Sequence, residues 1–388
     1  MKLRIVIRIV LGVVALFLVV FGGWIASLPP APPAAATPAS PIPKAEAEAT
    51  RAALRPPKRA RPLVAIVGIN DATETTDYLV PYGILRRAAV ADVLALATEP
   101  GPVTLFPALK VEPDATIASF DAQHPQGADY VVVPAMSRDD DPVALRWIRS
   151  QAAKGATVIG VCAGAKIVGA AGLLDGKRAT THWYYLSELR GATPSLRYVA
   201  DRRFVVDGRI ATTTGISASM PMALTLIEAI AGSEKAEAVA RELGLPRWDG
   251  RHDSDAFRFT RPFALTVLGN TLAFWNREQL GIELASGIDE VSLALVADAW
   301  SRTYRSRAVT FARSQQALKT ASGLRILPDR FATDWPAKTL LPAIGGRPPL
   351  HALDDALRAI AGRYGTPTAR VVAQQLEYPA TLDHADER

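Results

Sequence analysis

The chain has 388 residues, of which 49% are hydrophobic and 21% are charged, and its net charge is +6. This length allows two or three domains with cores of their own, and the single cysteine excludes an internal disulfide. The 44 basic residues are spread along the chain, which argues against nucleic acid as a partner and favours a solvated surface or attraction to anionic lipid.

The N-terminal segment has the composition of a membrane anchor. Lys2, Arg4 and Arg8 precede residues 9–28, which carry no charge, and a helix rising ~1.5 Å per residue would cross a bilayer core of roughly 30 Å over that length. The flanking cations predict a single-pass membrane protein whose folded part lies on the extracytoplasmic, periplasmic side. A cleavable signal peptide is the alternative, because small residues follow at 34–36.

The chain divides into four segments by composition. Residues 1–28 are the anchor or signal peptide, and residues 29–61 are rich in proline and alanine and then in charge. Such a composition predicts an extended, semi-stiff linker. An α/β domain is expected over 62–248, and a second region over 249–388.

From residue 62 onward, apolar β-branched runs alternate with stretches of helical periodicity. Strands are expected at 62–68, 102–106, 130–133 and 157–161, and helices at 76–94, 143–154, 163–174, 220–231 and 234–243. Asp207-Gly208 between two further apolar runs predicts a hairpin turn. The alternation predicts a flavodoxin-like parallel sheet sandwiched by helices, whose sites form at the carboxyl ends of the strands.

Cys162, the only cysteine, stands at such an end. A tight turn between the strand at 157–161 and the following helix would expose its side chain, as a nucleophile elbow does. The first N–H groups of that helix would favour the thiolate and lower the thiol pKa. A buried, space-filling cysteine is the alternative. Gly160 and Gly164 favour the elbow, because a core strand rarely needs two glycines so close together.

Five separated motifs occur in the order typical of the ThiJ/PfpI superfamily, the class I glutamine amidotransferase-like fold. They are ADYVVVP at 128–134, VCAGA at 161–165, AGLLDGKRATTHW at 171–183, DRRFVVDGRI at 201–210 and TGISA at 214–218. On these motifs, the stretch of residues 62–245 resembles the amidase-like domain of AraC-class regulators. The C-terminal region does not resemble the DNA-binding domain of those regulators.

The resemblance implies a site of three side chains. Cys162 would be the nucleophile, Asp77 the acid that shares a proton with the thiol, and His182 a general base or substrate-orienting group. It also implies backbone N–H groups that hold an oxyanion, here those of Ala135, Ala163 and Gly164. Taken locally, Asp77 reads equally well as a helix N-cap, and His182 reads as a structural histidine.

The sequence departs from the superfamily pattern near this site. Ala163 stands where many relatives have histidine or threonine after the cysteine, and Ala135-Met136 stand where many have Gly-Gly. Pro221 replaces an acidic residue that is usual in the regulators. These departures favour a site that binds without turnover.

The C-terminal region echoes the first domain. Residues 282–300 resemble 65–86, with Asp289 near the place of Asp77, and residues 356–376 resemble 223–243. We infer a degenerate half-copy of the same fold that lacks the cysteine. It would form an intrachain pseudo-dimer with the first domain, and a homodimer of two chains is the alternative. A helix-turn-helix over 356–375 is a further interpretation, which the N-terminal charge bias disfavours.

Two functions follow from these observations. The first is a membrane-anchored cysteine enzyme of the hydrolase, amidase or hydratase type that acts on a small molecule. The second is a non-catalytic module that senses a ligand, or an oxidant through Cys162. No nucleotide or flavin motif occurs, and the stretch from His252 to Asp255 indicates a polar loop rather than a metal site. We therefore expect no cofactor and no metal.

Overall fold

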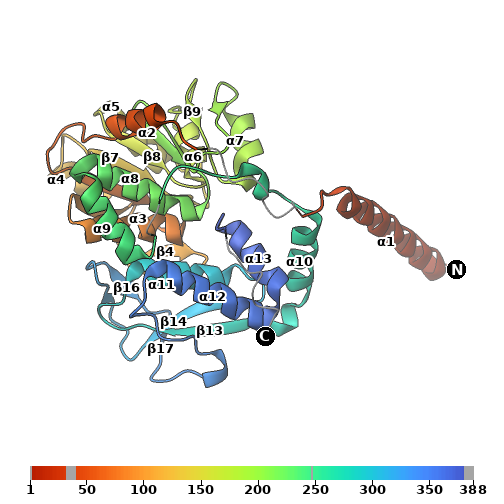
Figure 1. The fold of residues 1–388 in the computed structure, drawn as a ribbon. Coiled ribbons are helices and arrows are strands. Elements are labelled where there is room, and N and C mark those ends of the chain that lie inside the picture. Colours follow the sequence, from red (N-terminus) through yellow and green to blue (C-terminus); the bar gives the residue numbers. More distant parts are fainter. Residues whose placement is uncertain (1, 32–40, 246–247, 380–388) are drawn as a thin grey trace.

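Two α/β parts lie against each other, and one helix, α1 (Lys2–Ser27), extends away from both (Figure 1). This computed structural model describes residues 2–31, 41–245 and 248–379. Over those residues, the structure contains no helix long and apolar enough to cross a membrane. The anchor expected at residues 9–28 is therefore not supported, and the extracytoplasmic location stays a prediction.

The first part is built on a seven-stranded sheet with the order β11-β12-β8-β7-β1-β3-β6. Its strands are β1 (Leu63–Gly68), β3 (Asp92–Ala97), β6 (Ala115–Thr116), β7 (Tyr130–Val133), β8 (Thr157–Gly160), β11 (Phe204–Asp207) and β12 (Ile210–Thr213). Neighbouring strands run parallel, except that β11 and β12 form the antiparallel hairpin expected at Asp207-Gly208. The parallel sheet expected from the sequence is confirmed.

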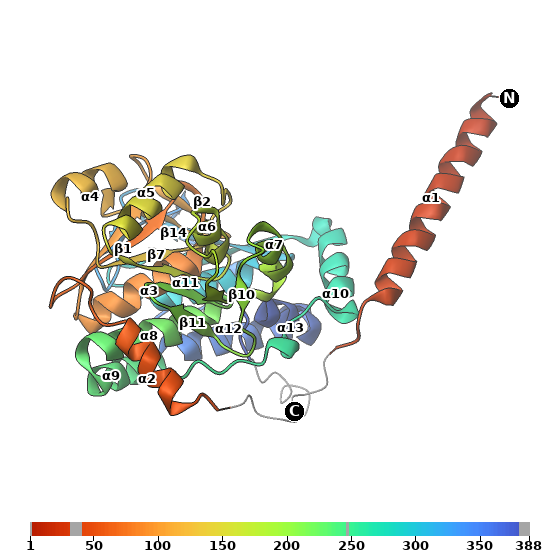
Figure 2. The same cartoon turned by 90° about the horizontal axis from the view of Figure 1, so that it is seen from above.

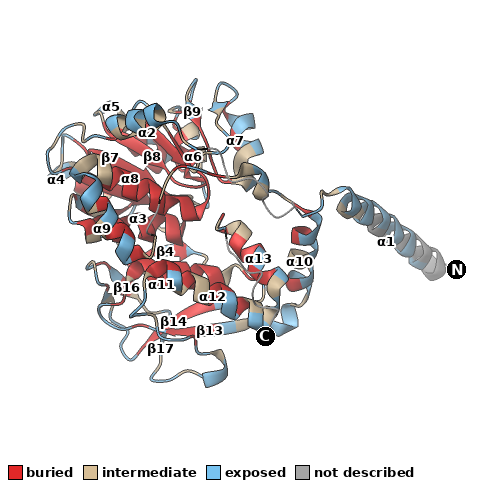
Figure 3. Cartoon of the chain, viewed as in Figure 1, coloured by how far each residue is buried: buried red, intermediate tan, exposed pale blue. Residues whose placement is uncertain are grey.

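Helices cover both faces of this sheet, as the alternation of side chains requires. Val64 and Ile66 of β1 enter one apolar cluster, whereas Ala65 and Val67 enter another. The first face packs against α3 (Thr75–Ala88), α8 (Ser219–Ala231) and α9 (Ser233–Leu243), and the second against α4 (Ile117–Gln123), α5 (Pro142–Ala153) and α6 (Gly164–Ala170). Figure 3 shows the buried strands between these layers.

One predicted helix of the first part is wrong in extent, and one predicted strand belongs to a different sheet. The helix expected at 76–94 ends at Ala88, because Ala89 adopts a left-handed conformation with φ 56°. The following residues form β3, which pairs with β1 along its whole length. The strand expected at 102–106 is β4 (Val103–Phe106), and it belongs to a separate sheet.

The charged half of the expected linker is folded rather than extended. Residues 44–53 form α2 (Lys44–Ala53), and the Leu54 carbonyl accepts a hydrogen bond of 2.6 Å from the Tyr130 hydroxyl. Arg59 pairs with the buried carboxylate of Asp129 at 2.6 Å. Burying that carboxylate requires a cation, so this segment is part of the first domain. The Pro/Ala-rich residues 32–40 lie outside the described residues.

The second part is an α/β region, as expected. It contains a parallel sheet of β13 (Glu278–Glu283), β14 (Ser306–Ala312) and β17 (Arg330–Phe331), with helices α10 (Arg261–Leu272), α11 (Glu290–Ser301), α12 (Pro349–Tyr364) and α13 (Thr366–Gln375). The unit β13-α11-β14 repeats the arrangement of β1-α3-β3. Leu353 of α12 and Val372 of α13 are buried in the main apolar cluster, so this helix pair packs into the core.

A five-stranded sheet belongs to both parts. Its order is β15-β16-β5-β4-β2, with β2 (Asp71–Glu74), β5 (Lys110–Glu112), β15 (Leu318–Lys319) and β16 (Arg325–Leu327) completing it. β16 of the second part pairs antiparallel with β5 of the first. Two short strands, β9 (Arg178–Ala179) and β10 (Arg197–Tyr198), and helix α7 (Leu186–Ala192) complete the first part.

Helices α3 and α11 form the centre of the contact between the two parts (Figure 2). Arg302, which follows α11, pairs with Glu74 at the start of α3 at 2.7 Å, and Arg87 near the end of α3 pairs with Asp289 at the start of α11 at 2.7 Å. The helices are therefore antiparallel, and the two ion pairs are reciprocal. Asp289 caps α11 as Glu74 caps α3. Asp289 therefore corresponds to Glu74, whereas the sequence pattern placed it near the position of Asp77.

Gly83 allows this close contact, which leads to a prediction. A Cβ atom at residue 83 would lie 2.5 Å from Val291 Cγ2, so Gly83→Ala should lower the free energy of unfolding by about 1–3 kcal/mol. Gly269→Ala in α10 is the control, because a Cβ there meets nothing within 4 Å and should stabilise by about 0.5–1 kcal/mol. Urea unfolding measures both, and a Gly83→Ala variant as stable as the wild type would contradict the packing.

Candidate functional site

Cys162 lies in a strained turn between β8 and α6. Its φ is 56°, a left-handed conformation that costs a residue with a side chain about 1–2 kcal/mol. The turn is held on both sides, because the Cys162 N–H donates to Thr213 Oγ1 at 3.0 Å and its carbonyl accepts from Thr181 Oγ1 at 3.0 Å. The tight turn predicted from the sequence is present, but the expected exposure of the side chain is wrong, because Cys162 is buried in the apolar core.

The two glycines beside the elbow have a steric reason. A Cβ atom on Gly164 would lie 2.0 Å from the Val133 carbonyl oxygen, and one on Gly160 would lie 3.0 Å from Ala165 Cα. Only glycine at residue 164 lets α6 begin this close to the end of β7. The elbow therefore brings Cys162 to the carboxyl edge of the two central strands.

The surroundings of the sulfur raise the thiol pKa well above its usual range. Cys162 is 4% exposed, and burial is the largest cause, followed by the charges of Asp77 and Glu74. The hydrogen bond from the Ala163 N–H acts in the opposite direction. The lowered pKa expected from the helix N-terminus is wrong, because α6 is short and two carboxyl groups face the sulfur from α3.

Asp77 is fully buried in the first turn of α3. Its Oδ2 accepts a hydrogen bond of 3.1 Å from the Ala135 N–H, and its Oδ1 has no partner. Burial and the charge of Glu74 raise the pKa of Asp77 well above its usual range. The structure thus places Asp77 near enough to Cys162 for its charge to raise the thiol pKa, and burial favours the protonated form of the acid.

A second carboxylate, Glu74, supports Asp77 and was not predicted. It caps α3, where Oε2 accepts from the Asp77 N–H at 2.5 Å and from Thr76 Oγ1 at 2.9 Å. Its other oxygen pairs with Arg302, which also binds Asp298 at 2.7 Å. Glu74 is visible in the sequence as a carboxylate just before a helix, whereas Arg302 belongs to the second α/β part and carries no local signal.

His182 is buried and has partners at both ring nitrogens. Nδ1 accepts from the Tyr184 N–H at 3.1 Å, so Nε2 carries the proton and donates to the Gln375 carbonyl at 2.9 Å. Burial lowers its pKa and keeps the ring neutral. No lone pair is left to accept a proton from Cys162 in this arrangement, which fits the structural histidine weighed above. The role of general base stays a prediction.

The three N–H groups expected to hold an oxyanion already have partners. The Ala135 N–H donates to Asp77, the Ala163 N–H to the sulfur of Cys162, and the Gly164 N–H to the Val161 carbonyl at 2.7 Å. The Ala163 N–H is the one directed at the reacting atom. The Ala163 N–H would therefore be the first group to stabilise a negative charge that develops on a carbon bound to the sulfur.

The C-terminal segment closes over the loops beside the site. The Glu377 carboxylate is 1% exposed and accepts from the N–H groups of Trp183 at 2.7 Å and Gly215 at 2.8 Å. A Cβ atom on Gly215 would lie 2.7 Å from Glu377 Cβ. His252 Nε2 lies 3.5 Å from the same carboxylate. No local pattern in the sequence connects Glu377 to this region.

A cavity of about 470 Å³ adjoins the elbow. It reaches Thr181, whose hydroxyl binds the Cys162 carbonyl. Aromatic side chains form much of the lining, namely Trp183, Tyr184, Tyr198, Phe257 and Phe259. Arg258 and Glu377 add charge to the wall. Among the described residues, no cluster of histidine, cysteine and acidic side chains could hold a metal ion.

The fold and the elbow define an α/β protein with a cysteine at the end of a central parallel strand. The profile of the DJ-1/PfpI family matches residues 64–229. An isonitrile hydratase of Pseudomonas putida is 38% identical over 169 residues, which cover 42% of this chain and 70% of the hydratase. The chain belongs to the DJ-1/PfpI family.

Two further proteins are similar to part of this chain. The HTH-type transcriptional regulator CdhR of Pseudomonas aeruginosa is 34% identical over 112 residues, which cover 29% of this chain and 33% of the regulator. The solved structure of a DJ-1 superfamily protein from Salmonella typhimurium covers 48% of this chain and 100% of its own, at 24% identity and a TM-score of 0.43. The family match ends before α10, so the second α/β part lies outside it.

The strain at the elbow can be measured by replacing the cysteine. Cys162→Gly should be more stable than Cys162→Ala by about 1 kcal/mol, because only glycine adopts φ 56° without a penalty. Urea unfolding of the two variants gives the difference. A glycine variant less stable than the alanine variant would mean that the turn is not strained.

The buried carboxyl group of Asp77 predicts a pH dependence of stability. Its folded-state pKa is raised, so stability falls as pH rises from the unfolded-state pKa through the folded-state pKa. Asp77→Asn should flatten this loss above the unfolded-state pKa of about 3.9, as measured by urea unfolding. Asp92→Asn, in an exposed ion pair with Arg61, is the control and should keep the wild-type slope. Equal slopes for the wild type and Asp77→Asn would contradict the assignment.

Proposed function

We propose that this protein is a cysteine-dependent enzyme that adds water to an electrophilic carbon of a small molecule, a hydratase-type reaction. The observation that carries the proposal is the strained Cys162 near the buried acid Asp77, whose charge acts on the thiol and whose Oδ1 has no hydrogen-bond partner. The isonitrile hydratase relative supports this reaction class, because it shares 38% identity over 70% of its length. Hydrolase or amidase chemistry uses the same nucleophile and is the related alternative.

In the proposed reaction, Cys162 forms the bond to carbon, and Cys162 and Asp77 together supply the proton. With an isonitrile, the sulfur bonds to the terminal carbon while the proton held by the Cys162–Asp77 pair passes to that carbon, which gives a thioimidate. Water then adds to the same carbon, and a proton passes to the nitrogen. The carbon–sulfur bond breaks, the thiol regains its proton, and an N-substituted formamide leaves. Overall, one isonitrile and one water give one N-substituted formamide.

The raised thiol pKa suits this order of events. A buried thiol next to a protonated acid stays neutral until an electrophile arrives. The proton then needs to move only between two neighbouring groups, the Cys162 thiol and the Asp77 carboxyl, with the Ala163 N–H directed at the sulfur. This arrangement keeps the thiolate from persisting in the resting protein, where oxidants would consume it.

One observation favours a second function, a module that binds a ligand without turnover. The expected oxyanion donors and both ring nitrogens of His182 are occupied within the protein. A bound ligand would then use the aromatic cavity that adjoins Thr181. Oxidant sensing is the less favoured form of this function, because Cys162 is buried and its thiol pKa is raised.

The test is turnover of a panel of isonitriles, amides and aldehydes, with products followed by mass spectrometry. Isonitriles should give formamides, Cys162→Ala should abolish the reaction, and Asp77→Asn should slow it by about 10²–10⁴-fold. Asp92→Asn is the matched control for loss of a carboxylate on the surface and should keep the wild-type rate. Turnover that survives Cys162→Ala would refute the proposal. Thermal stabilisation by a panel compound without any product would support the binding function instead.

A further inference from the structure

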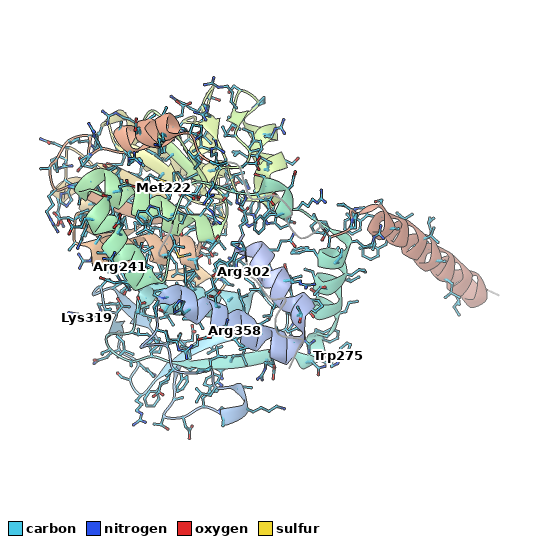
Figure 4. All side chains as sticks on the ribbon, viewed as in Figure 1. Met222, Arg241, Trp275, Arg302, Lys319 and Arg358 are labelled. Atoms are coloured by element: carbon cyan, nitrogen blue, oxygen red, sulfur yellow. The ribbon has the colours of Figure 1, made fainter. Side chains whose placement is uncertain are left out.

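Arg302 connects the second α/β part to the cysteine site. Its side chain is largely buried, and it forms 2.7 Å contacts with Glu74 Oε1 through Nη2 and with Asp298 Oδ1 through Nε. Figure 4 shows Arg302 where the two α/β parts meet. Burial opposes the charged guanidinium, but Asp298 and Glu74 raise its pKa, so it stays a cation. It follows α11, outside the stretch matched by the family.

One cation here faces more than one buried carboxyl group. Asp77 and Asp298 each have an oxygen without a partner, and neither side chain is exposed. A single guanidinium cannot balance three carboxylates in a low-dielectric site. Burial raises the pKa of Asp77 and of Asp298 well above the usual range, so these two carboxyl groups favour bound protons, and how many they hold depends on Arg302.

We propose that Arg302 is a positioning residue, supplied by the second α/β part, which completes the cysteine site and controls the protonation of the Asp77–Cys162 pair. It pairs with Glu74, the cap of α3, and Glu74 in turn accepts from the Asp77 N–H at 2.5 Å. The Asp77 side chain is thereby held at the Ala135 N–H, near enough to the sulfur to act on the thiol pKa. Arg302 acts through these groups and does not need to touch a substrate.

The reciprocal contact of α3 and α11 gives this assignment a structural basis. An ion pair that is repeated with its partners exchanged is the pattern of a two-fold interface between identical subunits, here Arg302–Glu74 and Arg87–Asp289. The second part thus occupies the position of a partner subunit within one chain, an intrachain pseudo-dimer. Only one of the two ion pairs has a cysteine beside it.

The charged and titratable groups that face the site come from several elements. They are Asp77 and Glu74 at the start of α3, Asp298 and Arg302 at the end of α11, Tyr185 beside α7, and Glu377 after α13. Glu377 adds to the raised pKa of Cys162. Arg302 is the cation that directly contacts the carboxylates of α3 and α11 at this end of the helix pair.

The experiment titrates the one thiol of the full-length chain. Thiolate absorbance is followed against pH, with the Cys162→Ser form of each variant as the blank, so no turnover is needed. Arg302→Gln should raise the apparent thiol pKa by about one unit or more, because a nearby opposite charge is lost. Arg302→Lys should keep the apparent thiol pKa close to the wild-type value, because the cation remains. Asp298→Asn should lower the thiol pKa, because Asp298 no longer offsets the charge of Arg302.

Arg87→Gln is the matched control, because it breaks the equivalent ion pair at the other end of the same helices, about 20 Å away. It should lower the melting temperature about as much as Arg302→Gln and leave the thiol titration unchanged. Equal titrations for these two variants would overturn the proposal and leave Arg302 as an interface contact. If Arg302→Gln does not fold, Asp298→Asn decides, and a wild-type titration for that variant would also overturn the proposal. Because the readout is the thiol alone, a failure here is distinct from a failure to find turnover.

Discussion

The buried ion pair between Arg302 and Glu74 joins the two α/β parts. It also acts on the cysteine, because the charge of Glu74 affects the thiol pKa. A carboxylate that caps a helix inside the protein needs a counter-charge, since water cannot reach it. That counter-charge comes from more than 200 residues away in the sequence. The first domain alone would leave Glu74, Asp77 and the thiol facing one another without a cation, so folding of the second part and the state of the site are coupled.

The two parts are also joined by their backbones. Strand β16 extends the sheet that contains β5. Helix α11 packs closely against α3, because Gly83 has no side chain to separate the two helices. This interface buries apolar side chains from both helices in one cluster. The DJ-1/PfpI family profile matches residues 64–229, within the first part, and the second part supplies the surface against which α3 packs.

The residues of this site differ in how well they could be predicted from the sequence. Cys162 and its glycines were predicted because a strand, a small-residue turn and a helix leave a clear local pattern. Asp77 followed from the resemblance and not from its neighbours, which fit an N-cap equally well. The lowered thiol pKa was predicted from a local helix terminus and proved wrong, because the carboxyl groups of α3 and the burial of the sulfur have larger effects.

The sequence by itself determined the alternation of strands and helices, the elbow at Cys162 and the presence of a second α/β region, because hydrophobic period and turn residues act over a few neighbours. The sequence did not predict the end of α3, because β3 forms through pairing with β1 and not through local preference. Only the tertiary structure decided the charge balance around the thiol and the partners of His182. Those depend on Arg302, Gln375 and Glu377, which meet the site through packing of distant segments, and electrostatic energies inside a protein follow distance in space rather than position in the chain.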